Sequence, residues 1–351
     1  MNAWRSSLQT VKRSILRSVI RPLMHWSPLE SPVPGYTIAV ACHWRFPEMF
    51  EASLLFLAEQ DLTGFHALIC AFDAPKTPAL EAAARRIASA HPTWRIEFLY
   101  QSRLQSAVLR RINWGWVDCW LSYSKCLASA RTQYVMLHDM DAMLLDRSFV
   151  RRRYECITEK RLQFLGVRWY TYNGLRESDR LLYVVEMMLD VQWLRAHCVP
   201  IDLFNKIHRF GDRRVDLDTL IFPQTLASAK MELPISGEQW VHPSQVISQF
   251  TYLAGRPGYA PPAANNLFFI PYFMHLAGHP LPLDELSARL SEAGGGSAVP
   301  FFGYTLDMRN LTREHHDWIR KQIEQLEAAR FGRMRTAIAV YLSAIGACIR
   351  A

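Results

Sequence analysis

The chain has 351 residues, of which 50% are hydrophobic and 21% charged, and this composition excludes a disordered or low-complexity protein. The longest apolar segment, residues 337–349, is shorter than the roughly 20 residues that a membrane-spanning helix needs. Seven cysteines occur without a Cys-x-x-Cys pair. They predict reduced thiols and a cytoplasmic location, not a disulfide framework or a zinc site.

The formal net charge of +8 comes from the two ends of the sequence. Residues 1–29 contain five Lys or Arg and no acidic residue, and residues 328–351 contain four and none. The remaining segment has 31 basic and 32 acidic residues. Because this body is nearly neutral and has no basic patch interleaved with aromatic residues, nucleic acid is not an expected partner.

The basic N-terminal segment, residues 1–32, predicts an amphipathic helical extension. Apolar residues recur on one face of the helix, at Trp4, Leu8, Val11, Ile15 and Val19. The opposite face carries Arg13, Arg17 and Arg21. This pattern suits peripheral contact with the inner face of an anionic membrane, or with a partner. The alternative is a helix that packs on its own domain and only solvates its polar face.

Apolar runs and helical segments then alternate along the chain. Strands are expected at 36–41, 66–72, 95–100 and 134–138, and helices at about 47–60, 78–90 and 116–130. This alternation predicts an α/β fold with a mostly parallel central sheet covered by helices.

The second half of the chain is less regular. We expect strands at 163–167 and 266–274 and helices at 178–194, at 312–329 and in the basic C-terminal tail. The expected organisation is a catalytic domain over residues 33–282, followed by a linker and C-terminal helices over 283–351. Gly294, Gly295 and Gly296 would form a flexible connector.

The most informative residues are Asp139 and Asp141, directly after the fourth expected strand. In an extended chain, residues i and i+2 point the same way, so both carboxylates can face the edge of the sheet where ligands bind. Such hard oxygen ligands favour Mg²⁺ or Mn²⁺, and a cation stabilises a departing diphosphate. A second pair, Asp216 and Asp218, lacks this context, and most such pairs are solvated loops or helix caps.

The order of elements resembles the nucleotide-sugar-dependent glycosyltransferases of the GT-A fold over roughly residues 36–280. The resemblance rests on Gln60-Asp61, on a second β-run ending in Asp73, and on a strand leading into Asp139-Met140-Asp141. It implies a Rossmann-like GT-A domain, a UDP- or GDP-sugar donor and a Mn²⁺ or Mg²⁺ cofactor. The Gln-x-x-Arg-Trp signature of processive synthases is absent, which argues against a polymerising enzyme.

The resemblance also implies which residues hold the donor. The nucleoside would be held by Ala41, His43 and Arg45, which follow the first strand, and by Asp73, which follows the second. Asp139 would contact both the nucleotide and the metal.

The third metal ligand implied by the resemblance is His275, in the sequence His275-Leu276-Ala277-Gly278-His279-Pro280. A lone histidine after an apolar run is more often satisfied by a backbone carbonyl, and this alternative stays open. Arg111 and Lys125 could approach the diphosphate, although a solvated helix face explains such residues equally well.

A transferase also needs a base for the acceptor hydroxyl. The candidates are Asp218, Asp216 and Glu238, all downstream of the metal pair. Asp218 could instead cap a helix, and Glu238 could lie in a surface turn.

The sequence therefore predicts a metal-dependent glycosyltransferase of polysaccharide biosynthesis that acts on a glycan or lipid-linked acceptor. A nucleotidyltransferase on sugar phosphates would use a similar acidic pair, but it usually has a Gly-rich loop where Cys42-His43-Trp44-Arg45 stands. A non-catalytic membrane-associated scaffold that keeps the fold is the remaining alternative.

Overall fold

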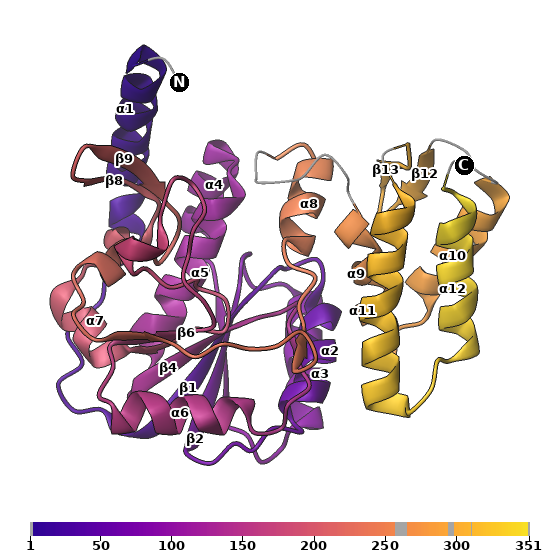
Figure 1. Cartoon of the computed structure of the whole chain (residues 1–351), viewed down its shortest axis with the longest axis horizontal. Helices are drawn as coiled ribbons and strands as arrows, with labels where there is room; N and C mark the ends of the chain where they lie inside the picture. The colour runs from indigo at the N-terminus through magenta and orange to yellow at the C-terminus, as the bar shows by residue number, and fades with distance from the viewer. Residues whose placement is uncertain (1–2, 257–264, 294–297, 310, 350–351) are drawn as a thin grey trace.

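The computed structural model describes residues 3–256, 265–293, 298–309 and 311–349 (Figure 1). Its centre is a seven-stranded sheet in the order β10-β6-β7-β4-β1-β2-β3. The strands are β1 (Val33–Cys42), β2 (Phe65–Phe72), β3 (Ile96–Tyr100), β4 (Thr132–Asp139), β6 (Phe164–Gly166), β7 (Met188–Asp190) and β10 (Lys230–Glu232). Only β7 runs antiparallel to its neighbours in this sheet, so the expected mostly parallel α/β fold is confirmed.

Side chains alternate between the two faces of the sheet, as the pleat requires. Ile38 and Val40 of β1 belong to one hydrophobic cluster, whereas Ala39 belongs to a second one on the other face. The first cluster is covered by α2 (Pro47–Leu57), α3 (Pro78–Ala90), α6 (Phe149–Glu159), α8 (Val246–Leu253), α9 (Phe269–Leu276), α10 (Leu281–Ala293), α11 (Arg313–Phe331) and α12 (Thr336–Ala347). The second is covered by α1 (Ala3–Ile20), α4 (Arg103–Ile112), α5 (Gly115–Ser129) and α7 (Val191–His197).

Two predicted elements are wrong. Residues 266–274, expected as a strand, form η5 (Asn265–Phe268) and α9. A short apolar run that is buried on all sides does not distinguish strand from helix by periodicity. Residues 178–194, expected as a helix, contain β7 and the start of α7. Asp190 separates the two, because its side chain accepts the backbone N–H of Trp193 and caps α7.

The extensions at both ends are helical. The expected boundary between residues 282 and 283 falls within α10, and Gly294, Gly295 and Gly296 lie outside the described residues. Leu283 of α10 and Tyr341 of α12 are buried in the same cluster as Val40. Among the described residues, no helix has the length and apolarity needed to cross a membrane. All seven cysteines lie within the described residues, and none of them forms a disulfide there.

The carboxyl ends of the central parallel strands meet at one edge of the sheet. In register, Ala41 of β1 pairs with Asp139 of β4 on one side and with Ala71 of β2 on the other. The residues after these strands, including His43 and Asp73, therefore share an edge with the Asp139–Asp141 turn.

Candidate active site

Three side chains converge beyond the end of β4. The Nε2 atom of His242 lies 3.5 Å from Asp139 Oδ2 and 3.3 Å from Asp141 Oδ1. One potential ligand atom from each residue lies within 4.8 Å of the other two. The aspartate side chains keep 30% and 10% of their surface exposed, so both can be reached from solvent.

His242 reaches this place through a short strand pairing. β11 (Trp240–Val241) runs antiparallel to β5 (Met143–Leu144), and Val241 lies opposite Met143. This pairing places the next residue, His242, beside the turn that carries Asp139 and Asp141. His242 could not be predicted from the sequence, because a two-residue strand is too short to show a hydrophobic periodicity. The only local signal is the pair Trp240-Val241 before it.

The electrostatics of the three residues suit a cation. Burial raises the pKa of Asp139 to about 6; His242 lowers this pKa, and the Asp141 carboxylate raises it. Burial alone would lower the pKa of His242, but the two aspartates outweigh it and raise that pKa. Two carboxylates and an imidazole aimed at one point form a donor set that fits Mn²⁺ or Mg²⁺, and the imidazole favours Mn²⁺.

A fully buried glutamate supports this site from inside the protein. Both carboxylate oxygens of Glu186 lie 2.9 Å from His138 Nδ1, and Oε1 also accepts the backbone N–H of Asp139 at 3.1 Å. Tyr123 donates from its hydroxyl to Asp139 Oδ1 at 2.7 Å. The backbone and side chain of Asp139 are thus held before any ligand binds.

The predicted nucleoside residues Asp73 and His43 lie together. Asp73 Oδ1 accepts the backbone N–H of Trp44 at 2.7 Å, and its Oδ2 lies 3.9 Å from His43 Nε2. Burial raises the pKa of Asp73 to about 7 and lowers the pKa of His43 to about 4. The pair therefore offers a neutral imidazole and a carboxyl group that can hold a proton near neutral pH.

Asp118 and Arg256 belong to the same cluster and were missed by the sequence analysis. Asp118 Oδ2 accepts from Arg256 Nη2 at 2.5 Å, and Asp118 Oδ1 accepts from Gln101 at 3.2 Å. Burial, and next the charge of Asp73, raises the pKa of Asp118 to about 6. Asp118 lies within the apolar pattern of α5, and Arg256 lies just after the end of α8, so neither position carries a sequence signal.

The three predicted donor-binding cations make contacts of different kinds, and the backbone N–H of Arg45 donates to His43 Nδ1 at 3.3 Å. Arg45 donates to the carbonyl of Phe302, in the turn between β12 (Ala298–Phe301) and β13 (Tyr304–Asp307). Lys125 donates to the carbonyl of Tyr100, and burial lowers the pKa of Lys125. Arg111 is exposed at the end of α4. Among the described contacts, none brings these cations to Asp139 or Asp141.

His275 is not part of the converging set. It lies near the end of α9, where burial and then Arg335 lower its pKa. It occurs in neither group of described residues that could hold a metal ion. The apolar run before it is a helix and not a strand.

The second such group contains Glu48, Glu51 and His279. Arg86 Nη2 already lies 3.4 Å from Glu48 and 2.6 Å from Glu51, so a cation is built into that group. His279 lies 3.6 Å from Glu51 and not beside the Asp139–Asp141 turn.

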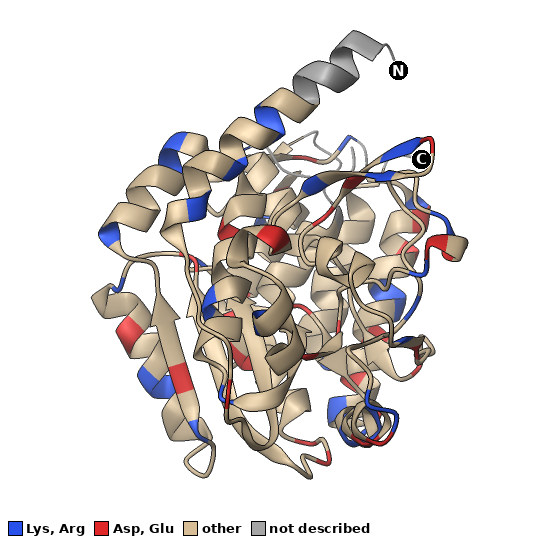
Figure 2. Cartoon of the chain, turned by 90° about the vertical axis from the view of Figure 1, so that its left-hand side faces the viewer, with Lys and Arg blue, Asp and Glu red and all other residues tan. Residues whose placement is uncertain are grey.

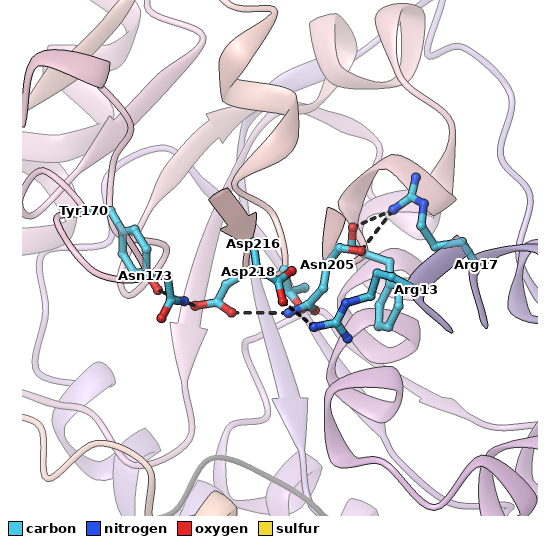
Figure 3. A network of polar contacts seen from close by, with 9 residues as sticks. Arg13, Arg17, Tyr170, Asn173, Asn205, Asp216 and Asp218 are labelled. Carbon is cyan, nitrogen blue, oxygen red and sulfur yellow. Dashed lines mark hydrogen bonds and ion pairs between the residues drawn. The ribbon is translucent and has the colours of Figure 1, made fainter. Parts of the chain in front are cut away.

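The two acidic residues at the end of β9 (Arg213–Leu217) face different partners (Figure 3). Asp216 pairs with Arg13 of α1 at 2.7 Å. Asp218 accepts hydrogen bonds from Tyr170 and, at 3.1 Å, from Asn173, both on Oδ2. Its Oδ1 accepts from Asn205 at 3.2 Å.

Aromatic rings connect Asp218 with the metal pair. Tyr170, which donates to Asp218, stacks on Tyr183 with ring centroids 5.6 Å apart. Burial, and next the charge of Asp139, raises the pKa of Tyr183. Burial also raises the pKa of Asp218. Glu238, in contrast, is exposed in the turn before β11, and no described contact links it to the site.

Comparison with known proteins gives distant structural likenesses. No protein-family model matches the chain, and no curated protein matches its sequence. The mannosyltransferase PcManGT from Pyrobaculum calidifontis, solved in complex with GDP-Man and Mn²⁺, is 15% identical, with 91% of this chain and 92% of that chain covered and a TM-score of 0.40.

Residues 1–349 of S. aureus TarS are 11% identical, with 89% of each chain covered and a TM-score of 0.40. The same part of TarS in complex with UDP gives a TM-score of 0.37. These likenesses are too distant to assign a function to this chain.

Proposed function

We propose that the protein is a metal-dependent glycosyltransferase that uses a nucleoside-diphosphate sugar, a UDP- or GDP-sugar, as donor. The observation that carries this proposal is the convergence of Asp139, Asp141 and His242 at the sheet edge that also presents Asp73 and His43. A divalent-cation site and a polar, partly buried nucleoside site at one edge of a parallel sheet match the two ends of such a donor.

Asp139, Asp141 and His242 would hold the ion, Mn²⁺ or Mg²⁺. When bound, such an ion stabilises the negative charge that develops on the departing diphosphate. Asp73 and His43 would orient the nucleoside, and the charged pair of Arg256 and Asp118 would border it. Glu186, through the backbone N–H of Asp139, would keep the first carboxylate in place.

Asp218 is the base that we propose for the acceptor side. In the transfer, the bond between the anomeric carbon and the diphosphate oxygen breaks, a bond to the acceptor oxygen forms, and the acceptor proton passes to a base. Asp218 is partly exposed, and its raised pKa favours proton uptake. Tyr170 and the exposed Tyr172 could carry a sugar ring beside it. The proposed acceptor is a glycan or lipid-linked sugar, reached at the inner face of a membrane.

The test is to measure binding and hydrolysis of a panel of UDP- and GDP-sugars with and without Mn²⁺. We expect binding and slow donor hydrolysis that depend on the metal, and we expect both to be lost in Asp141→Ala. The exposed Asp212, in the turn between β8 (Lys206–Phe210) and β9, gives the control Asp212→Ala, which should behave as the wild type. Both variants should unfold at nearly the wild-type temperature.

Two outcomes would contradict the proposal. Release of pyrophosphate from a nucleoside triphosphate and a sugar phosphate would identify a nucleotidyltransferase. Failure to bind any nucleotide or nucleotide sugar, with or without Mn²⁺, would favour a non-catalytic scaffold.

A further inference from the structure

The outward face of α1 is apolar. The side chains of Val11, Ile15 and Val19 are 55%, 60% and 51% exposed. They are spaced by four residues, so they form one continuous stripe along the helix. In a helix that merely covers a domain, such a stripe would face the core.

The inward face of α1 carries the arginines. Arg13 pairs with Asp216 at 2.7 Å, and Arg17 donates to the carbonyl of Phe204 at 2.7 Å (Figure 3). Ile20, at the end of the helix, is fully buried in the core. The helix therefore packs on its own domain through an inward face that combines the two arginines with Ile20 and the partly buried Leu16. Its orientation is fixed, and the apolar stripe is left outside.

The charge on the outer side of α1 is positive. Residues 1–29 contain no acidic residue. In Figure 2, the charged residues coloured on the described part of α1 are all Lys or Arg. Lys12 is exposed and forms no ion pair within the described part of the chain. Viewed down the helix axis, Lys12 projects next to Val19. A cation therefore borders the apolar stripe directly.

We propose that this outward face of α1 docks the protein on an anionic phospholipid bilayer, with the helix lying in the headgroup region. An apolar stripe bordered by cations has the two features that interfacial helices use, burial of apolar side chains and attraction to anionic lipids. A second copy of the chain fits this face less well, because pairing two such helices would bring their cations together. Docking does not depend on glycosyl transfer.

The experiment is co-sedimentation of the full chain with vesicles, without any nucleotide sugar. Vesicles of phosphatidylcholine containing phosphatidylglycerol are compared with vesicles of phosphatidylcholine alone. We expect binding to the anionic vesicles only, weakening as salt is added, because screening acts on the exposed cations. The double variant Val11→Asp/Ile15→Asp, called the α1 variant, should lower the partition coefficient for anionic vesicles more than tenfold. The single variant Lys12→Ala should lower the same coefficient roughly fivefold.

A matched control is available on the opposite end of the chain. Val340 lies on α12 and is 54% exposed, nearly the same as Val11. Val340→Asp therefore adds the same charge as Val11→Asp alone, at an equally exposed helix position, and it should bind vesicles as the wild type does. Because all these side chains are exposed, the unfolding temperatures should not change.

Three results would overturn the proposal. The first is no binding of the wild type to anionic vesicles. The second is equal loss of binding in Val340→Asp and in the α1 variant, which would show a nonspecific effect of charge. The third is a wild-type dimer that Ile15→Asp converts to a monomer, which would assign the stripe to self-association.

Discussion

The imidazole of His242 lies 3.3 Å from the carboxylate of Asp141, although the two residues are far apart in the sequence. We expect His242→Gln to weaken binding of Mn²⁺, measured by calorimetry in the presence of UDP or GDP. The loss should be at least about tenfold, since even residues that only support metal ligands cost 10–100-fold. His275→Gln is the matched control, and it should keep the wild-type affinity because His275 lies on α9. The reverse order of effects would restore His275 as the ligand.

The candidate residues whose place in the fold could be predicted from the sequence are those that follow strands with a clear pattern. The runs of β1, β2 and β4 are apolar and are separated by helices with their own period, so the edge where Asp73 and Asp139 lie follows from topology. This prediction needs only the order of the strands and not the positions of the Asp73 and Asp139 side chains.

The part that could not be predicted depends on contacts between irregular segments. His242 is brought in by the pairing of β11 with β5, and Arg256 reaches Asp118 by folding back of the chain after α8. Neither contact leaves a periodic pattern in the sequence. The strand expected before His275 is a helix for a related reason, because a short apolar run fits a helix as well as a strand.

Asp73 should make the stability of the protein depend on pH. Its pKa is about 7 in the folded protein, against 3.8 for an ordinary aspartate. Between these values the folded state keeps a proton that the unfolded state loses, so this residue adds stability as the pH falls from about 7 toward 4. Asp73→Asn should remove that slope. Each unit of pKa difference is worth about 1.4 kcal/mol and the difference is about three units, so at pH 8 the variant should be more stable by up to about 4 kcal/mol.

Urea unfolding at pH 5 and pH 8 measures this effect, with Asp212→Asn as the control for an exposed aspartate. The same variant should bind UDP or GDP more weakly, because Asp73 is proposed to orient the nucleoside. A pH slope identical to that of the wild type would show that Asp73 is not the titrating group.

Asp218 and Asp216 form a natural pair for testing the acceptor side. Asp218→Asn should lower the rate of transfer to the best alkyl glycoside acceptor by at least about 100-fold, the usual contribution of a general base, while metal-dependent nucleotide binding stays unchanged. Asp216→Asn should change transfer little, because its ion pair with Arg13 is partly exposed and worth less than about 1 kcal/mol. Equal rates for both variants, with a loss of stability in Asp218→Asn, would make Asp218 a structural residue.

Glu186 should stabilise both the fold and the metal site. Its carboxylate is fully buried and serves His138 and the backbone N–H of Asp139. Breaking a buried pair by neutralising one partner costs about 3–5 kcal/mol, so Glu186→Gln should lower the free energy of unfolding by nearly this amount in urea. The exposed Glu155→Gln is the control.

The double variant Glu186→Gln/His138→Gln separates the pair from other effects of the substitution. If the two side chains act together, the loss in the double variant is smaller than the sum of the single losses. Metal affinity should fall in Glu186→Gln as well, because Asp139 loses the carboxylate that fixes its backbone. Additive losses of stability with unchanged Mn²⁺ affinity would mean that Glu186 fills space without orienting the first metal ligand.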